Sequence, residues 1–236
     1  MQFQVRRFDS LDSTNRYLLD EARAGAPEGL VAVADYQTAG RGRRGRSWVA
    51  PPGVSLLVSV LVRPSLAPDR GQLVSIAAGM AMADAVERVA GFAPALKWPN
   101  DLLVEDKKLA GLLAEADGDA VVVGIGVNVE WHDFPPEVAE TATACNLVAG
   151  RPVERDQVLE VFLEQFATRY EDLDHVLAEY RARLATLGRR VRVETATGAL
   201  TGTAADVGEA GELLVDQDGG GRVAVHAGDV VHLRDA

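Results

Sequence analysis

Hydrophobic and polar positions along the chain repeat with two periods, and the places where the period changes predict the order of helices and strands. Residues 3–8 alternate as a strand does, and the apolar, β-branched runs 30–36 and 54–62 have strand length. Between the first two strands, Ser13 or Thr14 can cap a helix that ends near Gly25. Apolar residues at helical spacing over 69–90 predict a long helix with one buried face.

The middle of the chain predicts three strands followed by two helices. The strands are expected at 102–105, 108–116 and 120–129, and because short polar or glycine-bearing links join them, they should pair antiparallel. Residues 131–150 are expected to be irregular, and 153–187 has a helical period. This order is not a strict alternation of strand and helix. It predicts an α+β fold, with helices packed on a mixed, largely antiparallel sheet.

The pattern changes after Leu187. Short β-rich runs separated by Gly- and Asp-bearing turns follow at 190–195, 199–206, 212–216, 222–226 and 229–234. A series of short strands within about fifty residues is typical of a small β-barrel. We therefore expect two domains, a larger one over 1–187 and a C-terminal barrel over 188–236.

The composition is that of a globular protein with a sizeable core, since 47% of the 236 residues are hydrophobic and 25% are charged. No apolar run approaches the roughly 20 residues that a membrane span needs, and the N-terminus lacks the apolar stretch of a signal peptide. The single cysteine, Cys145, excludes an internal disulfide and fits a reducing compartment. The chain is therefore expected to be cytoplasmic, without a membrane partner.

The net charge of −11 makes nucleic acid an unfavourable partner for the surface as a whole. Against this background, residues 41–46 carry four arginines, which repel one another strongly if they are desolvated. A solvated basic turn is the plain interpretation, and an anionic ligand that neutralises the arginines is the one that we favour. Because these charges have no evident partner in the sequence, we also expect the loop 40–47 to be mobile without ligand.

The sequence of this arginine loop resembles two nucleotide-binding motifs, but the structural elements predicted around it differ from theirs. Residues 40–45 match G-x-G-x-x-G, and extension to Ser47 comes close to a P-loop. Both motifs need a helix directly after the loop, whose N-terminus holds the phosphates, whereas a strand is predicted here. What remains is the chemistry, because glycines allow close backbone approach and arginine forks suit carboxylates and phosphates. We therefore predict an anion-binding active-site loop.

Two further clusters place polar residues beside apolar strands. Around 97–101, the pair Trp98-Pro99 favours an extended or turn geometry before Asn100 and Asp101, and Lys108 precedes an apolar strand. These residues form either an ordinary turn with a snorkelling lysine or a set of charges aimed into a pocket. In 124–128, glycines interrupt a strand, which indicates close approach by a ligand or by another backbone.

Taken together, five blocks in this order and spacing resemble the biotin–protein ligase family, over nearly the whole chain. The blocks are Asp12-Ser13-Thr14-Asn15, residues 37–48, Lys97-Trp98-Pro99-Asn100-Asp101, Lys108-Leu109-Ala110-Gly111 and residues 124–128. Residues 228–234 resemble the end of that family's small SH3-like C-terminal domain. Many members carry an N-terminal helix-turn-helix domain that binds DNA. Here the catalytic pattern begins within the first fifteen residues, so we expect a monofunctional ligase with no DNA partner.

The resemblance implies a two-step, AMP-forming reaction. Biotin and MgATP give biotinyl-5′-adenylate and pyrophosphate, and a specific lysine on the biotin carboxyl carrier domain of a biotin-dependent carboxylase then displaces AMP. The first step brings a carboxylate against a polyphosphate, and the clustered arginines and Lys108 can cancel the repulsion between them. The sequence leaves both a monomer and a homodimer open.

The resemblance also implies which residues form the site. The catalytic residues are expected to be Lys108 and Arg43. Biotin is expected to contact Ser13, Thr14, Asn15, Gln37, Gly40, Arg41, Gly42, Arg43, Lys108 and Gly111. ATP or the adenylate is expected to contact Arg44, Arg46, Trp48, Asn100, Asp101 and Asn128, with Asp101 as the candidate ligand of Mg²⁺.

Two other functions remain open at this point. A lipoate–protein ligase shares the fold and the adenylation chemistry by family analogy but differs in its acid-binding pocket, and the arginine loop together with residues 97–101 favours biotin. A non-catalytic binding module, with the C-terminal barrel as its interaction surface, would not release pyrophosphate in response to biotin. The chain departs from the family at 142–147, where Ala-Thr-Ser-Leu is usual, which leaves the start of a short helix undetermined.

Overall fold

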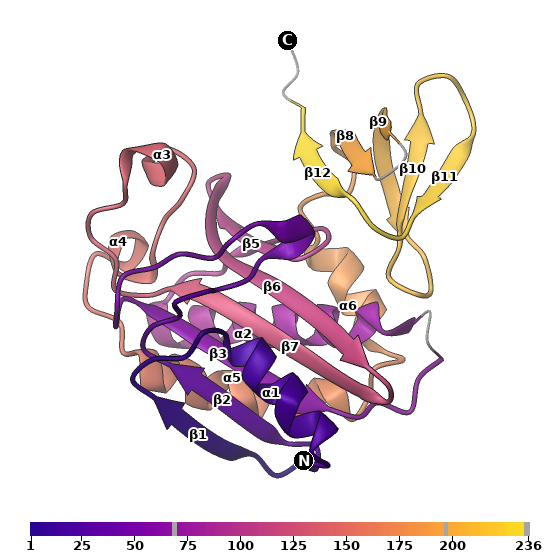
Figure 1. The fold of residues 1–236 in the computed structure, drawn as a ribbon. Helices are drawn as coiled ribbons and strands as arrows, with labels where there is room; N and C mark the ends of the chain where they lie inside the picture. The colour runs from indigo at the N-terminus through magenta and orange to yellow at the C-terminus, as the bar shows by residue number, and fades with distance from the viewer. Residues whose placement is uncertain (68–69, 196–197, 234–236) are drawn as a thin grey trace.

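The computed structural model describes residues 1–67, 70–195 and 198–233. The predicted start of the long helix at Asp69 and the predicted end of the last strand at Arg234 lie outside these ranges. Within them the chain forms a seven-stranded sheet covered by helices and a five-stranded sheet at the C-terminal end (Figure 1).

The large sheet is mixed and largely antiparallel, as the pattern predicts. Its strand order is β1-β2-β3-β7-β6-β5-β4, in which β1 and β2 pair in parallel and all other neighbours pair antiparallel. The strands are β1 (Gln4–Phe8), β2 (Leu30–Ala34), β3 (Ser55–Val62), β4 (Ala95–Lys97), β5 (Asp101–Val104), β6 (Lys107–Asp117) and β7 (Ala120–Asn128). Strand β4 was not predicted, because three residues are too few to show a period.

Helices cover both faces of this sheet. Helix α1 (Thr14–Arg23) lies on one face, and α2 (Gln72–Ala90), α5 (Arg155–Tyr170) and α6 (Val176–Arg183) lie on the other (Figure 1). Ser13 is the N-cap of α1, since its side chain accepts a hydrogen bond from Arg16 N. Helix α2 lies between the sheet and α5, which explains why most of its residues are buried.

The segment predicted to be irregular contains two short helices, α3 (Pro136–Ala139) and α4 (Cys145–Ala149). The prediction is wrong for these turns, which are too short for a helical period to appear in the sequence. Helix α4 starts at Cys145, which is fully buried and packs in the main core. This fixes the helix start that the unusual sequence at 142–147 left undetermined.

The C-terminal sheet contains all five predicted strands: β8 (Arg190–Thr195), β9 (Gly198–Val207), β10 (Leu213–Gln217), β11 (Arg222–Val225) and β12 (Asp229–His232). They pair antiparallel in the order β11-β10-β9-β8-β12. Across the described residues β11 and β12 are edge strands that do not pair with each other, so the sheet is open rather than a closed barrel.

The C-terminal sheet is packed tightly against the rest of the chain. One cluster of buried hydrophobic side chains includes residues of α2 and β6 together with Val191, Val193 and Leu213 of the small sheet. Trp98, which is fully buried, donates its indole N–H to Gly211 O over 2.9 Å, at the near end of β10. The domain division at 187/188 stays a prediction. In the part of the chain that the structure describes, no helix is long and apolar enough to cross a membrane.

Candidate functional site

A pocket of about 120 Å³ lies over the glycines of β6 and β7, between the N-terminus of α1 and the arginine loop. Most of the residues predicted for the site line it: Ser13, Thr14, Asn15, Gln37, Arg41, Gly42, Arg43, Arg46, Trp48, Asn100, Lys108 and Gly111. Gly40, Arg44, Asp101 and Asn128 are not among its lining residues. Sequence segments as far apart as Ser13 and Gly126 therefore meet in one place.

One end of the pocket is lined by short, neutral polar side chains. The segment after β2 runs beside Leu11, to which Gln37 forms a parallel bridge, and this brings the Gln37 amide to the start of α1. Gln37 Oε1 accepts from Thr14 N over 2.8 Å and from Thr14 Oγ1 over 3.0 Å. Ser13, Thr14 and Asn15 are buried, so a polar ligand here would meet short, fixed donors and acceptors.

The amide of Asn15 is held in one orientation by its partners. Its Nδ2 donates to Leu113 O over 3.1 Å and to Glu115 Oε2 over 2.9 Å, both of which only accept. Its Oδ1 therefore faces Ser59, whose hydroxyl lies 2.7 Å away. Glu115 and Ser59 were missed at the sequence level. Ser59 could have been suspected, because it is a buried polar residue within an otherwise apolar strand.

The arginine loop is a tight turn in the segment between β2 and β3. Gly42 N donates to Arg46 O over 2.7 Å and Trp48 N donates to Gly40 O over 3.0 Å, which closes the turn like a small hairpin. Residues Arg43–Gly45 form a single 3₁₀ turn, with Arg44 in the left-handed region at φ 56°. The next regular element is strand β3, so the absence of a phosphate-binding helix after the loop is confirmed.

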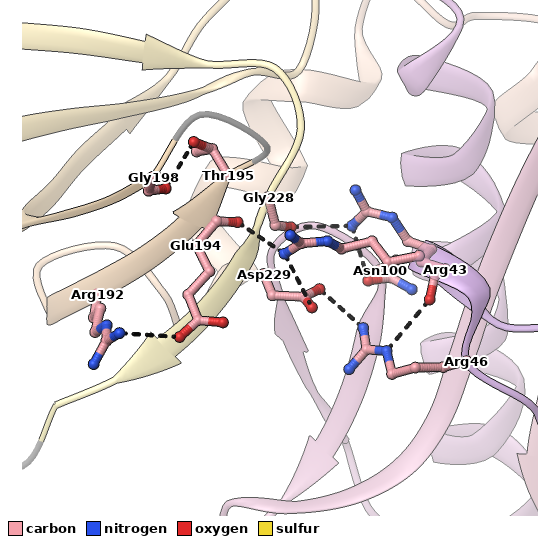
Figure 2. A network of polar contacts seen from close by, with 10 residues as sticks. Arg43, Arg46, Asn100, Arg192, Glu194, Thr195, Gly198, Gly228 and Asp229 are labelled. Carbon is pink, nitrogen blue, oxygen red and sulfur yellow. Dashed lines mark hydrogen bonds and ion pairs between the residues drawn. The ribbon is translucent and has the colours of Figure 1, made fainter.

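The loop arginines have partners within the protein, so the premise of our mobility prediction is wrong. Arg41 Nη1 lies 2.9 Å from Glu115 Oε1. Arg46 and Arg44 lie 2.9 and 3.5 Å from the two carboxylate oxygens of Asp229, on β12 (Figure 2). The sequence could not show this, because Glu115 and Asp229 are 74 and 183 positions from their arginines.

Arg43 is the loop arginine with the weakest compensation. Its Nη1 donates to Asn100 Oδ1 over 3.3 Å and to Gly228 O over 3.4 Å, both of them long contacts to neutral acceptors. Burial lowers the pKa of the Arg43 guanidinium, and the carboxylates of Asp229 and Asp101 partly oppose this. Arginine stays protonated in proteins. A half-buried cation without an adjacent carboxylate is therefore a favourable place for an anionic ligand.

Trp48 lies on the sheet, over two glycines where a larger residue would crowd the indole. A Cβ on Gly126 would lie 2.4 Å from Trp48 Cε2, and one on Gly111 would lie 3.1 Å from Trp48 Cζ3. The glycines of 124–128 were predicted to admit a ligand or another backbone, whereas here they admit side chains: Trp48 at Gly126 and Asn15 at Gly124. The indole Nε1 is buried and has no hydrogen-bond partner among the described residues.

The Lys108 side chain is directed toward the Trp48 ring. Lys108 is the second residue of β6, which follows the two-residue turn Glu105-Asp106 of the β5–β6 hairpin, where φ is positive at both positions. Its Nζ lies 2.7 Å from Asp101 Oδ1 and 5.7 Å from the centroid of the Trp48 ring. Burial lowers the pKa of the neighbouring Lys97, with Lys108 acting in the same direction and Asp101 opposing it.

The predicted residues outside the pocket are also placed. Asp101 pairs with Lys108, and Arg44 points to the C-terminal sheet. Gly40 fits against Trp48, since a Cβ there would meet Trp48 O at 2.3 Å. Asn128 is buried, with its Nδ2 donating to Thr143 O over 3.0 Å and its Oδ1 accepting from Ser55 Oγ over 3.3 Å. Its amide is thus already satisfied by the protein.

Comparison with known protein families gives two matches along the chain. Residues 7–130 match the biotin/lipoate A/B protein ligase family, and residues 186–233 match the biotin protein ligase C terminal domain. The first range contains every residue that lines the pocket. The second contains the strands of the C-terminal sheet.

Individual relatives agree with the family matches. The biotin–[acetyl-CoA-carboxylase] ligase of Mycobacterium tuberculosis is 41% identical over 94% of this chain and 86% of its own length. The bifunctional ligase/repressor BirA of Bacillus subtilis is 33% identical over 90% of this chain and 69% of its own length. Among solved structures, the biotin protein ligase from Aquifex aeolicus in complex with biotin and ATP superposes with a TM-score of 0.83, at 27% identity, over 98% of this chain and 99% of that one.

Proposed function

The chain belongs to the biotin/lipoate A/B protein ligase family, and we propose that its pocket joins biotin to ATP and then transfers biotin to a lysine of a carrier domain. The protein is an ATP-dependent, AMP-forming ligase. Its acceptor is the biotin carboxyl carrier domain of a biotin-dependent carboxylase. The buried, single cysteine fits a reducing compartment, and a cytoplasmic location is part of the proposal.

The observation that carries this proposal is the division of one pocket into two chemically different ends. Gln37, Thr14 and Asn15 offer neutral hydrogen-bonding groups at one end, which suits the ureido ring of biotin. Arg43 and Lys108 bring positive charge to the other end, which suits a carboxylate beside a phosphate. A ligand with a neutral polar head and an acidic tail matches this arrangement.

In the first step, a carboxylate oxygen of biotin attacks the α-phosphorus of ATP, the bond from that phosphorus to the bridging oxygen breaks, and pyrophosphate leaves. Both reactants are anions, so their approach is opposed by charge repulsion. Arg43 would contact the carboxylate and the α-phosphate, and Lys108 would stabilise the charge that builds up between them. Fixed cations in a partly desolvated pocket act strongly, because they need no reorganisation during the reaction.

In the second step, the amine of the acceptor lysine attacks the carbonyl carbon of the adenylate. The bond from that carbon to the phosphate oxygen breaks, AMP leaves with the electron pair, and the amine loses a proton. Lys108 would remain beside the same oxygen atoms and stabilise them again. A lysine near an aspartate and a tryptophan face is held in place for both steps.

The remaining contacts complete the proposal. Biotin would be held by Ser13, Thr14, Asn15, Gln37, Gly40, Arg41, Gly42 and Gly111, with Ser59 and Glu115 fixing Asn15 from behind. Trp48 would stack on adenine, and Arg44, Arg46 and Asn100 would meet phosphates. Asn128 would act on the adenylate through the backbone that it fixes, because its amide is already bonded to Thr143 and Ser55.

Mg²⁺ belongs to the proposal through Asp101. Magnesium usually binds one or two carboxylates together with the phosphates of the nucleotide. Asp101, whose Oδ1 lies 2.7 Å from Lys108 Nζ, is the carboxylate beside the pocket that would hold the ion. No group of three metal-ligating side chains exists among the described residues, which suits an ion held mainly by ATP. When bound, the ion would neutralise charge on the phosphates.

Pyrophosphate release tests the adenylation step without a carrier domain. Wild-type protein with ATP and MgCl₂ is expected to release pyrophosphate when biotin is added and not when lipoate is added. Release with lipoate alone would identify a lipoate ligase. No release with either acid would identify a binding module, and both outcomes would overturn the proposal.

A further inference from the structure

A single carboxylate of the C-terminal sheet faces two arginines of the catalytic loop. Asp229 begins β12, and its Oδ1 and Oδ2 lie 2.9 Å from Arg46 Nη2 and 3.5 Å from Arg44 Nη1 (Figure 2). Arg44 Nη1 also donates to Glu194 O over 3.1 Å, on the neighbouring strand β8. Two arginines of the loop are thus attached to two strands of the small sheet.

The strands behind Asp229 are held at a fixed distance from the loop. Asp229 pairs with Glu194 in the β8–β12 ladder. The residue before it must be glycine, since a Cβ on Gly228 would lie 2.8 Å from Val193 Cγ1. The carbonyl oxygen of Gly228 then accepts from Arg43. Close packing of β12 on β8 therefore sets the position of both the Asp229 carboxylate and the Gly228 carbonyl.

The small sheet itself is anchored to the catalytic part by contacts that do not involve the loop. Trp98 Nε1 donates to Gly211 O over 2.9 Å, and the Arg181 guanidinium donates to Val207 O over 3.0 Å from Nε. These bonds, with the shared hydrophobic core, make the sheet a rigid support rather than a loosely tethered module. A contact from this support to the loop can therefore hold the loop in place.

The loop needs such a support, because its backbone is otherwise unfavourable. Arg44 occupies the left-handed region at φ 56°, which non-glycine residues rarely adopt unless surrounding contacts impose it. Arg44 and Arg46 are also substantially exposed, with 41% and 59% of their side-chain surface accessible. Asp229 engages one nitrogen of each guanidinium, and each guanidinium has five N–H donors, so most donors stay available to a ligand.

We propose that Asp229 is a positioning residue for the ATP site: through Arg44 and Arg46 it holds the catalytic loop in the conformation that receives the triphosphate. The C-terminal sheet thereby acts on the nucleotide site. It lines no part of the pocket itself and acts only through the contact of Asp229 with the two arginines. The inference rests on the proposed adenylation reaction and adds the residue that preorganises it. Its consequence is selective, because biotin meets the other end of the pocket.

The test is the KM for ATP and the KM for biotin in pyrophosphate release, measured for D229N, D229E and D216N. An exposed charge pair is worth up to about fivefold in binding, so D229N is expected to raise the KM for ATP by about fivefold, with the KM for biotin within twofold of wild type. D229E keeps the carboxylate and should restore most of the ATP affinity. D216N is the matched control, because Asp216 pairs with Arg222 within the same sheet, 2.7 Å apart, and does not touch the loop.

An R44A/R46A background separates positioning from a general loss of stability. There D229N should change the KM for ATP by less than twofold, because its partners are absent. The inference is overturned if D229N has its full effect in that background, or if D229N alone leaves the KM for ATP unchanged. It is also overturned if D229N lowers the KM for ATP, because Asp229 would then compete with ATP. If D229N does not fold, Asp229→Ser carries the test in its place, and an unchanged KM for ATP in that variant overturns the inference. Wild-type protein without biotin-dependent pyrophosphate release would instead refute the proposed function.

Discussion

Replacement of Gly126 by alanine should displace Trp48 from the sheet. The added Cβ would lie 2.4 Å from Trp48 Cε2 and 2.7 Å from Nε1, well inside van der Waals contact, so either the indole or strand β7 has to move. The indole belongs to a surface loop and β7 is a central strand, so the indole should move. Overpacking typically costs 1–3 kcal/mol, and an indole that can swing outward should hold the cost to about 1 kcal/mol. That corresponds to a fall in Tm of about 2–4 °C for a chain of this size.

The effect on catalysis should be larger than the effect on stability. If Trp48 stacks on adenine, loss of the stack costs about 1–3 kcal/mol, which raises the KM for ATP by roughly 5- to 150-fold. Acrylamide quenching reports the displacement, because Trp98 and Trp131 are 0% and 7% exposed and should contribute little. Gly79→Ala in α2 is the matched control, since a Cβ there meets nothing closer than 3.7 Å. Increased quenching with an unchanged KM for ATP would refute the stacking role, and unchanged quenching would refute the steric argument.

Three further predictions follow from other residues of the structure. Lys108→Ala should slow adenylate formation by about 10²–10³-fold in stopped-flow assays while the Tm stays near that of wild type, and adenylation at the wild-type rate would contradict the assigned role. Ser59→Ala leaves Asn15 Oδ1 without its donor. This should lower the free energy of unfolding, measured in urea, by about 1–3 kcal/mol and should raise the KM for biotin. If neither the free energy of unfolding nor the KM for biotin changes, the proposed hydrogen-bond network is contradicted. Burial, assisted by the positive charges of Lys97 and Arg189, lowers the pKa of His232 to about 4. The unfolded chain takes up this proton below about pH 6.5, whereas the folded chain does not. The free energy of unfolding should therefore fall by about 2–3 kcal/mol as the pH drops from 6.5 to 4. His232→Gln should lose less stability over this interval, and an equal loss in both proteins would contradict this reasoning.

The neutral state of His232 also follows from its neighbours. Arg189 Nη1 lies 3.3 Å from Nδ1 and can only donate, so Nδ1 has to accept and the ring proton sits on Nε2, 3.2 Å from Thr186 Oγ1. A protonated ring would place one N–H against another. This local pattern, together with burial, explains why the pKa is lowered.

Long periodic elements were predictable from the sequence because their signal is local. The helix over 14–23, the strands from 102 to 128 and the five C-terminal strands all follow from hydrophobic period and turn residues. Strand β4 and the exact start of helix α4 were not predictable from hydrophobic period, because three and five residues are too few for a period to repeat. The small C-terminal barrel was predicted from its five short strands, but whether its edges β11 and β12 pair with each other is decided by no local pattern.

The candidate site shows the same limit. The residue types of the arginine loop predict an anion-binding surface, and all five of the resembling blocks contribute residues to one pocket. The ion pairs that hold the loop were not predictable, since they join Arg41 to Glu115 and Arg46 to Asp229 across strands that meet only in the folded chain. Counting charges along the sequence therefore suggested unpaired arginines where folding supplies partners.

The central claim is that this pocket makes an activated biotin and delivers it to one lysine. The most direct test is the intact mass of a biotin carboxyl carrier domain after incubation with the protein, biotin and MgATP. The account predicts the mass increase of one biotinyl group, on a single lysine, that depends on ATP and is lost with Lys108→Ala. An unchanged carrier mass under these conditions, or modification by lipoate in place of biotin, would contradict it.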